Sequence, residues 1–541
     1  MLAGVLVKAM GALFKIPLAA AAGDEAMGYF SSAYSVYSML FLISTAGIPA
    51  ALSRMIAAAR EKNETGRCRR IFRVSAVLLS GIGLFFALSL YFFASPIAAI
   101  PKEPALAPCL RVLSPVLFFI CVSAALRGYF QGMQNMVPTA VSQLIEAASN
   151  LVFGLGFGIR AKKAGLLPAQ IAARVLVGIV IGSALSALFL CLTYAFSRKS
   201  ACPLSGSRRA IAKELIAVAF PITLSAAVMS LCGIIDSMVA VRRLKESAVL
   251  DTATVRGLLL SLREAASPAS ADSFAVAIYG AYAAKAMTLF SLTPTLITPL
   301  ATSLLPAVGA AKAAGDEKTF SRSVTAAFRA AMILAFPAAV GLSVLASPII
   351  RLLFPSGEVL FFDGAGSAVT SLQAVPPMLS LLSFAIPFAG FVTVSAAVLQ
   401  GTGHEKKSVI CTLCGVTAKL IAVFFLPAIP QIGYLSLPLS TLICYLVMAL
   451  MHFVFLRRMA KVFLPLGAVF FKPLLSAAFC GAAALGAYLL FSKFTPENAA
   501  TVLAVLSGAA VYAAALFLTG AVRGKDGTPG DKKRRPAAFS E

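Results

Sequence analysis

The sequence predicts an all-α polytopic membrane protein with fourteen transmembrane helices, and three observations lead to this class. Of its 541 residues, 60% are hydrophobic and only 12% are charged, whereas soluble domains are about 45–50% apolar and about 25% charged. The apolar residues form runs of about 20, which is the length that crosses a bilayer as a helix. The alternating polar and apolar pattern of a membrane β-barrel is absent from the sequence.

The apolar runs define the expected spans in chain order. We place them at 2–20, 28–53, 74–100, 110–130, 139–159, 169–196, 214–240, 276–304, 324–350, 377–400, 408–427, 434–456, 473–491 and 499–521. The first span is short before Pro17, which predicts a start codon farther upstream. In the second span, the Gly-Ile-Pro stretch that ends at Pro49 predicts a bend.

Charge placement predicts how the chain is oriented. An even number of spans puts both termini on one side. If that side is the cytoplasm, the loops and tail facing it hold more than twice as many lysines and arginines as the opposite loops. We therefore expect a bacterial plasma-membrane protein with both termini cytoplasmic, and we attribute the net charge of +25 to this pattern rather than to nucleic-acid binding. The 241–275 loop is the exception, because its Arg242, Arg243 and Lys245 would lie outside.

An internal repeat predicts the domain organisation. Residues 57–72 resemble 309–324, and 94–100 resemble 346–352, both at an offset of 252. Residues 122–132 also resemble 394–401, after an insertion near 355–373. Six spans separate the matched elements, so we expect two six-helix lobes related by a pseudo-two-fold axis along the membrane normal. The predicted boundaries are 1–200 and 214–456 for the lobes, 201–213 for a cytoplasmic linker, 457–521 for two further helices and 522–541 for a disordered basic tail.

Cations inside the spans are the first candidate binding residues, since each costs about 2.5–3.5 kcal/mol at a helix centre on insertion scales. Lys8 and Lys15 are two helical turns apart on one face of the first span, Arg54 ends the second, and Lys285 lies in the eighth. These spans occupy equivalent positions in the two lobes, which favours a cationic cavity between them. The alternative is that the side chains extend to the membrane interfaces.

Two acids lie inside spans, Glu146 in the fifth and Asp236 in the seventh. Glu146 suits a polar contact between helices, and Arg127 suits an anchor at the end of the fourth span. Asp236 pairs either with the arginines that follow it or with Lys419, a deep cation in the eleventh span. All three groups, Glu146, Asp236 and Lys419, are also candidates for ion coupling.

Signals of an enzyme are missing from the sequence. It has two histidines, far apart, and we find no nucleotide-binding loop and no acidic pair spaced for a metal. Cys411 and Cys414 form a C-x-x-C pattern, but in a membrane helix we interpret the ten cysteines as small apolar residues. We therefore expect a transporter without a cofactor or a bound metal.

Several stretches carry a resemblance to a known family. They are "KAMGALFKIPLA", "GYFSSAYSVYSMLFLISTAGIPAALSRMIAAA", "LRGYFQGMQNMVPTAVSQLIE", "FPITLSAAVMSLCGIIDSMVAVRRL", "TSLLPAVGAA" and "AAVLQGTGHEKKS". Together they resemble the polysaccharide biosynthesis branch of the multidrug/oligosaccharidyl-lipid/polysaccharide (MOP) exporter superfamily. The resemblance is to the stage V sporulation protein B (SpoVB) group, which is related to MurJ-like lipid II flippases.

The resemblance implies both a fold and an activity. The fold is two six-helix lobes followed by two helices that line a lipid groove. The activity is flipping of an undecaprenyl-pyrophosphate-linked glycan, with lipid II as the first choice, from the inner to the outer leaflet by alternating access. By position, Lys8, Lys15 and Arg54 match or lie near basic cavity residues of the family, and Lys285 is placed by the repeat. The implied partners are the lipid-linked glycan, membrane lipids and cell-wall synthesis proteins.

Some relatives bind sodium through acids in the seventh and eleventh spans, whereas here the eleventh offers Lys419, which would replace the ion. Three alternatives to a lipid II flippase stay open. They are a flippase for another polysaccharide unit such as O-antigen or capsule, a cation-coupled multidrug antiporter, and an envelope or sporulation scaffold that transports nothing. A cationic cavity favours an anionic substrate over the cations that multidrug antiporters carry.

Overall fold

The computed structural model describes residues 16–45, 47–61, 64–196, 207–250, 271–355, 357–362, 368–429, 432–459, 462 and 464–521. Within these ranges the chain is helical apart from one short hairpin, as expected for apolar segments whose backbone groups must form hydrogen bonds inside the bilayer. The expected range 2–20 of the first span lies mostly outside the described residues. Residues 16–22, at its end, are helical.

The first half of the chain forms long helices joined by short turns. Its elements are α2 (Asp24–Thr45), α3 (Ile48–Glu61), α4 (Thr65–Phe92), α5 (Ala94–Ala99), the 3₁₀ turn η1 (Pro104–Leu106), α6 (Ala107–Gly132), α7 (Val137–Ser149), the π-helical turn η2 (Asn150–Gly154), α8 (Leu155–Lys163) and α9 (Pro168–Phe196). The expected break of the second span is present, since α2 ends and α3 begins on either side of Gly47.

The second half begins with α10 (Arg208–Ile234), the π-helical turn η3 (Ile235–Ala240), α11 (Val241–Leu250), α13 (Ala271–Ala281), the π-helical turn η4 (Tyr282–Ala286) and α14 (Met287–Ala313). It continues with α15 (Glu317–Val344), α16 (Ala346–Leu353), the strands β1 (Val359–Phe362) and β2 (Ala368–Thr370), α17 (Ser371–Ser383) and α18 (Ala385–Gly401). The two strands pair antiparallel, and they lie within the segment that interrupts the sequence repeat.

The remaining elements are α19 (Glu405–Phe425), the 3₁₀ turns η5 (Leu426–Ala428) and η6 (Gly433–Leu435), α20 (Ser436–Arg458), the π-helical turn η7 (Gly467–Phe471), α21 (Lys472–Phe491) and α22 (Glu497–Leu518). In the described part of the chain, eleven helices are long and apolar enough to cross a membrane. The count is twelve if α17 and α18, which are bent by 42°, form one span. The all-helical polytopic class is thus confirmed, and the count of fourteen stays a prediction.

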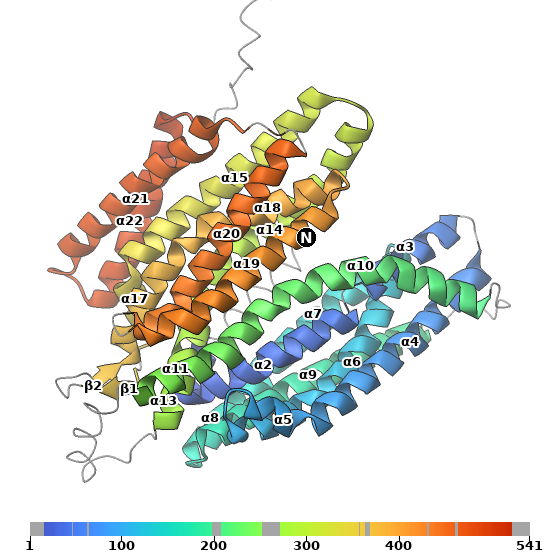
Figure 1. Cartoon of the computed structure of the whole chain (residues 1–541), viewed down its shortest axis with the longest axis horizontal. Coiled ribbons are helices and arrows are strands. Elements are labelled where there is room, and N and C mark those ends of the chain that lie inside the picture. The colour runs from blue at the N-terminus through green and yellow to red at the C-terminus, as the bar shows by residue number, and fades with distance from the viewer. Residues whose placement is uncertain are drawn as a thin grey trace, which may run out of the picture.

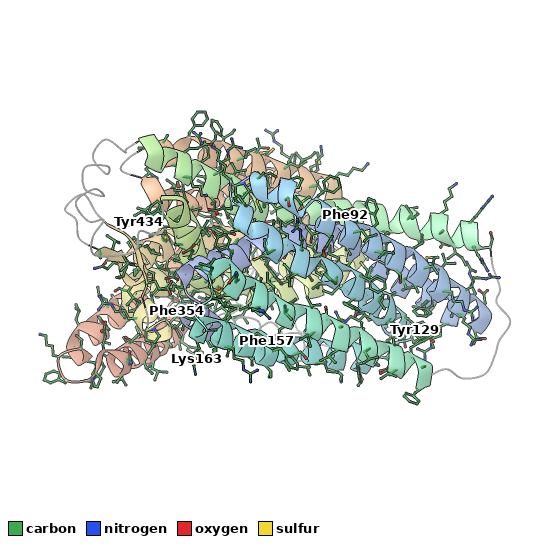
Figure 2. All side chains as sticks on the ribbon, turned by 90° about the horizontal axis from the view of Figure 1, so that it is seen from below. Phe92, Tyr129, Phe157, Lys163, Phe354 and Tyr434 are labelled. Carbon is green, nitrogen blue, oxygen red and sulfur yellow. The ribbon has the colours of Figure 1, made fainter. Side chains whose placement is uncertain are left out.

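The helices form two bundles that meet at one end of the molecule (Figure 1). One bundle holds α2 to α9, and the other holds α14, α15 and α17 to α22. They lie together near β1, β2, α11 and α13, which we call the hairpin end, and they diverge toward the end where α3 lies. Figure 2 shows Lys163, Phe354 and Tyr434 toward the hairpin end and Tyr129 toward the opposite one.

The helix α10 connects the two bundles. Its residues Ile211, Leu215 and Ala219 are buried in the same apolar cluster as α3, α4 and α6 of the first half. Its last turn instead packs against the large core that the two halves share. The chain of the second half therefore starts inside the core of the first half.

At the hairpin end the two halves touch backbone to backbone through α2 and α13. A Cβ atom added to Gly28 would overlap the carbonyl oxygen of Val276, and one added to Gly280 would overlap that of Asp24. Only glycine permits this approach. The close packing brings the charged start of α2 next to η4, where the candidate Lys285 lies.

Candidate functional site

The structure separates the four cations that the sequence grouped. Lys8 and Lys15 lie outside the described residues. Arg54 has an exposed side chain on α3, and this helix lies toward the end of the molecule opposite the hairpin end (Figure 1). Lys285 lies in the π-helical turn η4 at the hairpin end, and its side chain is 1% exposed. The structure therefore does not bring Arg54 and Lys285 together.

Lys285 forms a buried ion pair with Asp24, which joins the two halves of the chain. Its Nζ lies 2.7 Å from Oδ1 and 3.0 Å from Oδ2 of Asp24, whose side chain is only 2% exposed. The same Nζ donates a hydrogen bond of 2.7 Å to the Oγ of Ser371, at the start of α17. The Phe354 ring lies 5.8 Å from the ammonium. A cation at this depth is tolerated because its charge is paired and its hydrogen bonds are made.

The segment around the hairpin completes this contact. The Oε2 of Glu358, just before β1, accepts a hydrogen bond of 2.6 Å from the backbone N–H of Asp24. Its Oε1 lies 3.4 Å from the Nζ of Lys162, at the end of α8. The insertion that interrupts the sequence repeat thus supplies Glu358 and Ser371 to the junction between the halves.

A second charged cluster at the hairpin end explains the exception to the charge pattern. Lys245 pairs with the buried Glu103, which also accepts a hydrogen bond of 3.1 Å from the Tyr29 hydroxyl. Arg242 and Arg243 both pair with Glu246, at 3.0 and 2.9 Å. Arg242, Arg243 and Lys245, the cations of this loop that the structure describes, therefore each have an acidic partner.

Glu246 is the anion that holds this cluster together. Besides the two arginines, Lys102 lies 3.4 Å from its carboxylate. Hydrogen bonds from Arg242 and Arg243 lower the pKa of Glu246 to about 2. Arg243 in addition stacks 4.2 Å from the centre of the Phe424 ring and donates to the Phe424 carbonyl. The cluster links α11 to the loop after α5 and to α19.

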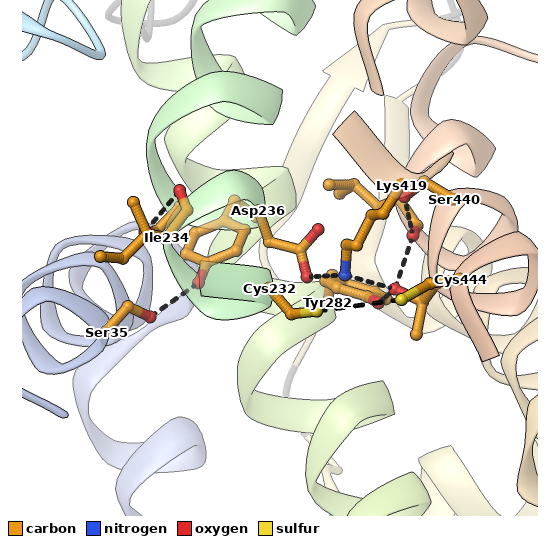
Figure 3. Close-up of polar contacts among 12 residues, drawn as sticks. Ser35, Cys232, Ile234, Asp236, Tyr282, Lys419, Ser440 and Cys444 are labelled. Carbon is orange, nitrogen blue, oxygen red and sulfur yellow. Dashed lines mark hydrogen bonds and ion pairs between the residues drawn. The ribbon is translucent and has the colours of Figure 1, made fainter. Parts of the chain in front are cut away.

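Asp236 and Lys419 form a second buried ion pair, shown in Figure 3. Lys419 Nζ lies 2.7 Å from Asp236 Oδ2 and donates a hydrogen bond of 3.0 Å to the Oγ1 of Thr441. The Tyr282 hydroxyl lies 3.1 Å from the same Oγ1. Of the two partners considered for Asp236, the structure selects Lys419, because Arg242 and Arg243 are occupied by Glu246. Both Asp236 and Lys285 lie in π-helical turns, which are frequent at functional sites.

Glu146 takes part in a third intramembrane pair, inside the first half. The Nη2 of Arg127 lies 2.8 Å from Glu146 Oε2 and donates a hydrogen bond of 3.0 Å to Ser186, while its Nε donates to Ser142. Sequence reasoning treated Arg127 as a terminal anchor, but it links α6 to α7 and α9. Both side chains are about one-fifth exposed, so this pair is less enclosed than the other two.

Sequence reasoning missed Asp24, Ser371 and Glu358. Asp24 lies between the first two expected spans, where an acidic residue is common and therefore does not indicate a functional site. A signal for the other two was present, because the insertion near 355–373 breaks the repeat at the point that contributes them. Among the described residues, no group of three or more His, Cys, Asp or Glu side chains is placed to hold a metal.

Comparisons with known proteins agree with this architecture. Residues 1–312 match the family model described as polysaccharide biosynthesis protein, and residues 270–425 match the MatE model. Stage V sporulation protein B of Bacillus subtilis is 24% identical, over 83% of this chain and 80% of that protein. The lipid II flippase MurJ of the same organism is 26% identical, over 83% of this chain and 80% of its own length.

A solved structure shares the fold. The lipid II flippase MurJ in an inward closed conformation superposes with a TM-score of 0.67 and 16% sequence identity, covering 96% of this chain and 99% of that chain. The MurJ relative is named as a flippase and the structural neighbours as flippases or transporters, and the chain is a multi-pass membrane transporter rather than an enzyme. It belongs to the polysaccharide biosynthesis protein family, in the flippase group of the MOP exporter superfamily.

Proposed function

We propose that this protein flips an undecaprenyl-pyrophosphate-linked glycan, with lipid II as the substrate, from the inner to the outer leaflet. In this proposal it has fourteen spans, two six-span lobes related by a two-fold axis, and cytoplasmic termini, so the hairpin end faces outward. The observation that carries the proposal is the buried Lys285–Asp24 pair between the halves. The relatives named as a lipid II flippase and as a sporulation protein support the substrate class.

The pair suits a substrate that is an anion. A lysine buried to this degree needs an anionic partner in every conformation, because an unpaired charge there costs several kcal/mol. If the halves separate at the hairpin end, Asp24 on α2 moves away from Lys285 on η4. A phosphate oxygen of the substrate then replaces the carboxylate, so opening outward is favourable only when substrate is bound. Lys8, Lys15 and Arg54 complete the cationic path for the pyrophosphate in this proposal.

The second ion pair bears on energy coupling. Lys419 places an ammonium next to Asp236 where some relatives hold sodium, so transport here proceeds without sodium. The membrane potential acts on the charged complex instead. Glu146, paired with Arg127, then stabilises the first lobe rather than coupling an ion.

The test is a leaflet-accessibility assay for lipid II in cells depleted of their other flippases. The wild-type protein is expected to restore lipid II to the outer leaflet, and Lys285→Met is expected not to. Lys162→Gln is the matched control, because this lysine lies at the same end but is 46% exposed and pairs with an exposed acid. It is expected to behave like wild type.

Each alternative function has its own outcome. If lipid II stays inward while the protein is present in the membrane, the lipid II assignment is wrong, and the same assay with O-antigen or capsule intermediates tests the broader class. Export of cationic drugs would instead indicate a multidrug antiporter. Full complementation by a variant in which Lys8, Arg54 and Lys285 are all neutral would favour a scaffold.

A further inference from the structure

Two cysteines from distant parts of the chain lie side by side next to the second ion pair. The sulfur atoms of Cys232, near the end of α10, and Cys444, in α20, are 3.8 Å apart (Figure 3). This is thiol–thiol contact, from which the two sulfurs must approach to about 2.05 Å to form a disulfide bond. Sequence reasoning treated all ten cysteines as small apolar residues, and 212 residues separate these two.

The two thiols face the Asp236–Lys419 pair from both helices. Cys232 in α10 precedes Asp236 in η3 by four residues, about one helical turn, and Cys444 follows Thr441 by three residues in α20. Thr441 accepts the hydrogen bond from Lys419. A covalent bond between these cysteines would therefore fix the two helices at the point where the ion pair already joins their neighbours.

The two cysteines differ in their access to reagents. Cys444 is 1% exposed, whereas Cys232 is partly exposed. Cys232 is therefore the thiol that a small oxidant reaches first, and Cys444 is in place to react with the product.

We propose that Cys232 and Cys444 form a redox-active dithiol, whose disulfide links α10 to α20 and stops the movement of the two halves. The oxidant is a small disulfide. The Cys232 thiolate attacks one of its sulfurs and releases the other half as a thiol. The Cys444 thiolate then attacks the Cys232 sulfur of the mixed disulfide and releases the second thiol. Two electrons pass from the cysteines to the oxidant, and the two protons end on the released thiols.

The consequence follows from the position of α10. Residues Ile211, Leu215 and Ala219 of this helix are buried in the core of the first half, whereas Cys444 belongs to the bundle of the second half. A disulfide at the far end of α10 therefore fixes this helix, whose start lies in the core of the first half, to the bundle of the second half. The inference concerns control of movement and does not depend on the identity of the substrate.

The experiment uses the full-length protein in membrane vesicles, treated with the membrane-permeant 4,4′-dithiodipyridine. Mass spectrometry of the digested protein is expected to find Cys232 linked to Cys444, with loss of transport that a reducing agent reverses. Cys232→Ser and Cys444→Ser each are expected to abolish both the linkage and the reversible loss. Cys411→Ser/Cys414→Ser is the matched control, since both of these cysteines lie on α19, and it is expected to respond like wild type.

Two results would overturn the proposal. In the first, Cys232 accumulates as the mixed disulfide and is not linked to Cys444, which would show that the second step does not occur. In the second, the two cysteines become linked but transport is unchanged, which would show that the disulfide does not stop the movement of the halves. Since the linkage is read by mass, the dithiol is tested even if the protein proves to carry a substrate other than lipid II.

Discussion

Two of the buried ion pairs in the described residues look alike locally but differ in what they connect. In each, a lysine Nζ lies 2.7 Å from a carboxylate oxygen, and a Ser or Thr hydroxyl accepts a further hydrogen bond. Asp24 and Lys285 come from different halves of the chain. Asp236 and Lys419 both come from the second half. The first pair must therefore separate if the halves move apart at the hairpin end, whereas the second joins η3 to α19 within the second half.

This difference separates a functional charge from a structural one. Burial and distance alone do not distinguish the pairs, because both lysines are nearly inaccessible and both would be destabilising if left alone. The distinguishing property is whether the bond crosses the junction between moving bodies. Removing one partner should destabilise the protein in both cases. Removing both partners should restore stability in both cases, but at the junction it should not restore transport.

The largest effect is expected at the junction. Lys285→Met leaves Asp24 charged and buried, which should cost about 3–5 kcal/mol of folding free energy and abolish transport. In Asp24→Asn/Lys285→Met neither charge remains, so stability should recover while transport stays lost, because the cation for the phosphate is gone. Thermal unfolding in detergent and the leaflet assay measure the two effects separately. Transport by the double variant would show that Lys285 is structural.

At the second ion pair, removing both charges should restore transport as well as stability. Lys419→Met should lower stability by a similar amount, roughly 3–5 kcal/mol, for the same reason. Asp236→Leu/Lys419→Met removes both charges, and we expect stability and most of the transport to return. The same two measurements apply. A stable but inactive double variant would mean that this pair, too, takes part in the transport cycle.

Sequence reasoning reached the fold more completely than the site. Hydropathy places helices because the bilayer imposes one length and one hydrogen-bonding pattern on every span. The repeat located the insertion that forms β1 and β2. The pairing of Lys285 with Asp24 was out of reach, because it depends on how closely α2 and α13 pack through Gly28 and Gly280. Lys285 itself was found, since a lysine inside an apolar span is conspicuous, and Asp24 was missed, since an acid before a span is not.

A smaller effect is expected where the hairpin segment meets the first half. Glu358→Gln keeps an oxygen that accepts from the Asp24 N–H but removes the ion pair with Lys162. Both of those side chains are nearly half exposed, so the loss of stability should stay below about 1 kcal/mol. Glu358→Ala also leaves the Asp24 N–H without this acceptor, and we expect a further loss of about 1–3 kcal/mol. Equal unfolding temperatures for the two variants would show that the hydrogen bond to Asp24 contributes nothing.

The smallest effect is a pH dependence at the charged cluster of α11. The pKa of Glu246 is lowered from its ordinary 4.5 to about 2 by the neighbouring arginines. A carboxyl group with a lowered pKa stabilises the fold fully above its unfolded pKa, and this contribution is lost as the pH falls through the folded pKa. The difference in unfolding temperature between wild type and Glu246→Gln should thus be greatest above pH 4.5 and disappear near pH 2.

A matched control isolates this contribution from general acid unfolding. Glu497 pairs with Arg351 at 3.2 Å on the surface, where both side chains are nearly half exposed, so Glu497→Gln should change the unfolding temperature little at any pH. If Glu246→Gln behaves in the same way, the cluster does not hold α11 to the first half. Two buried pairs, Asp24–Lys285 and Glu103–Lys245, would then remain as electrostatic links across the junction.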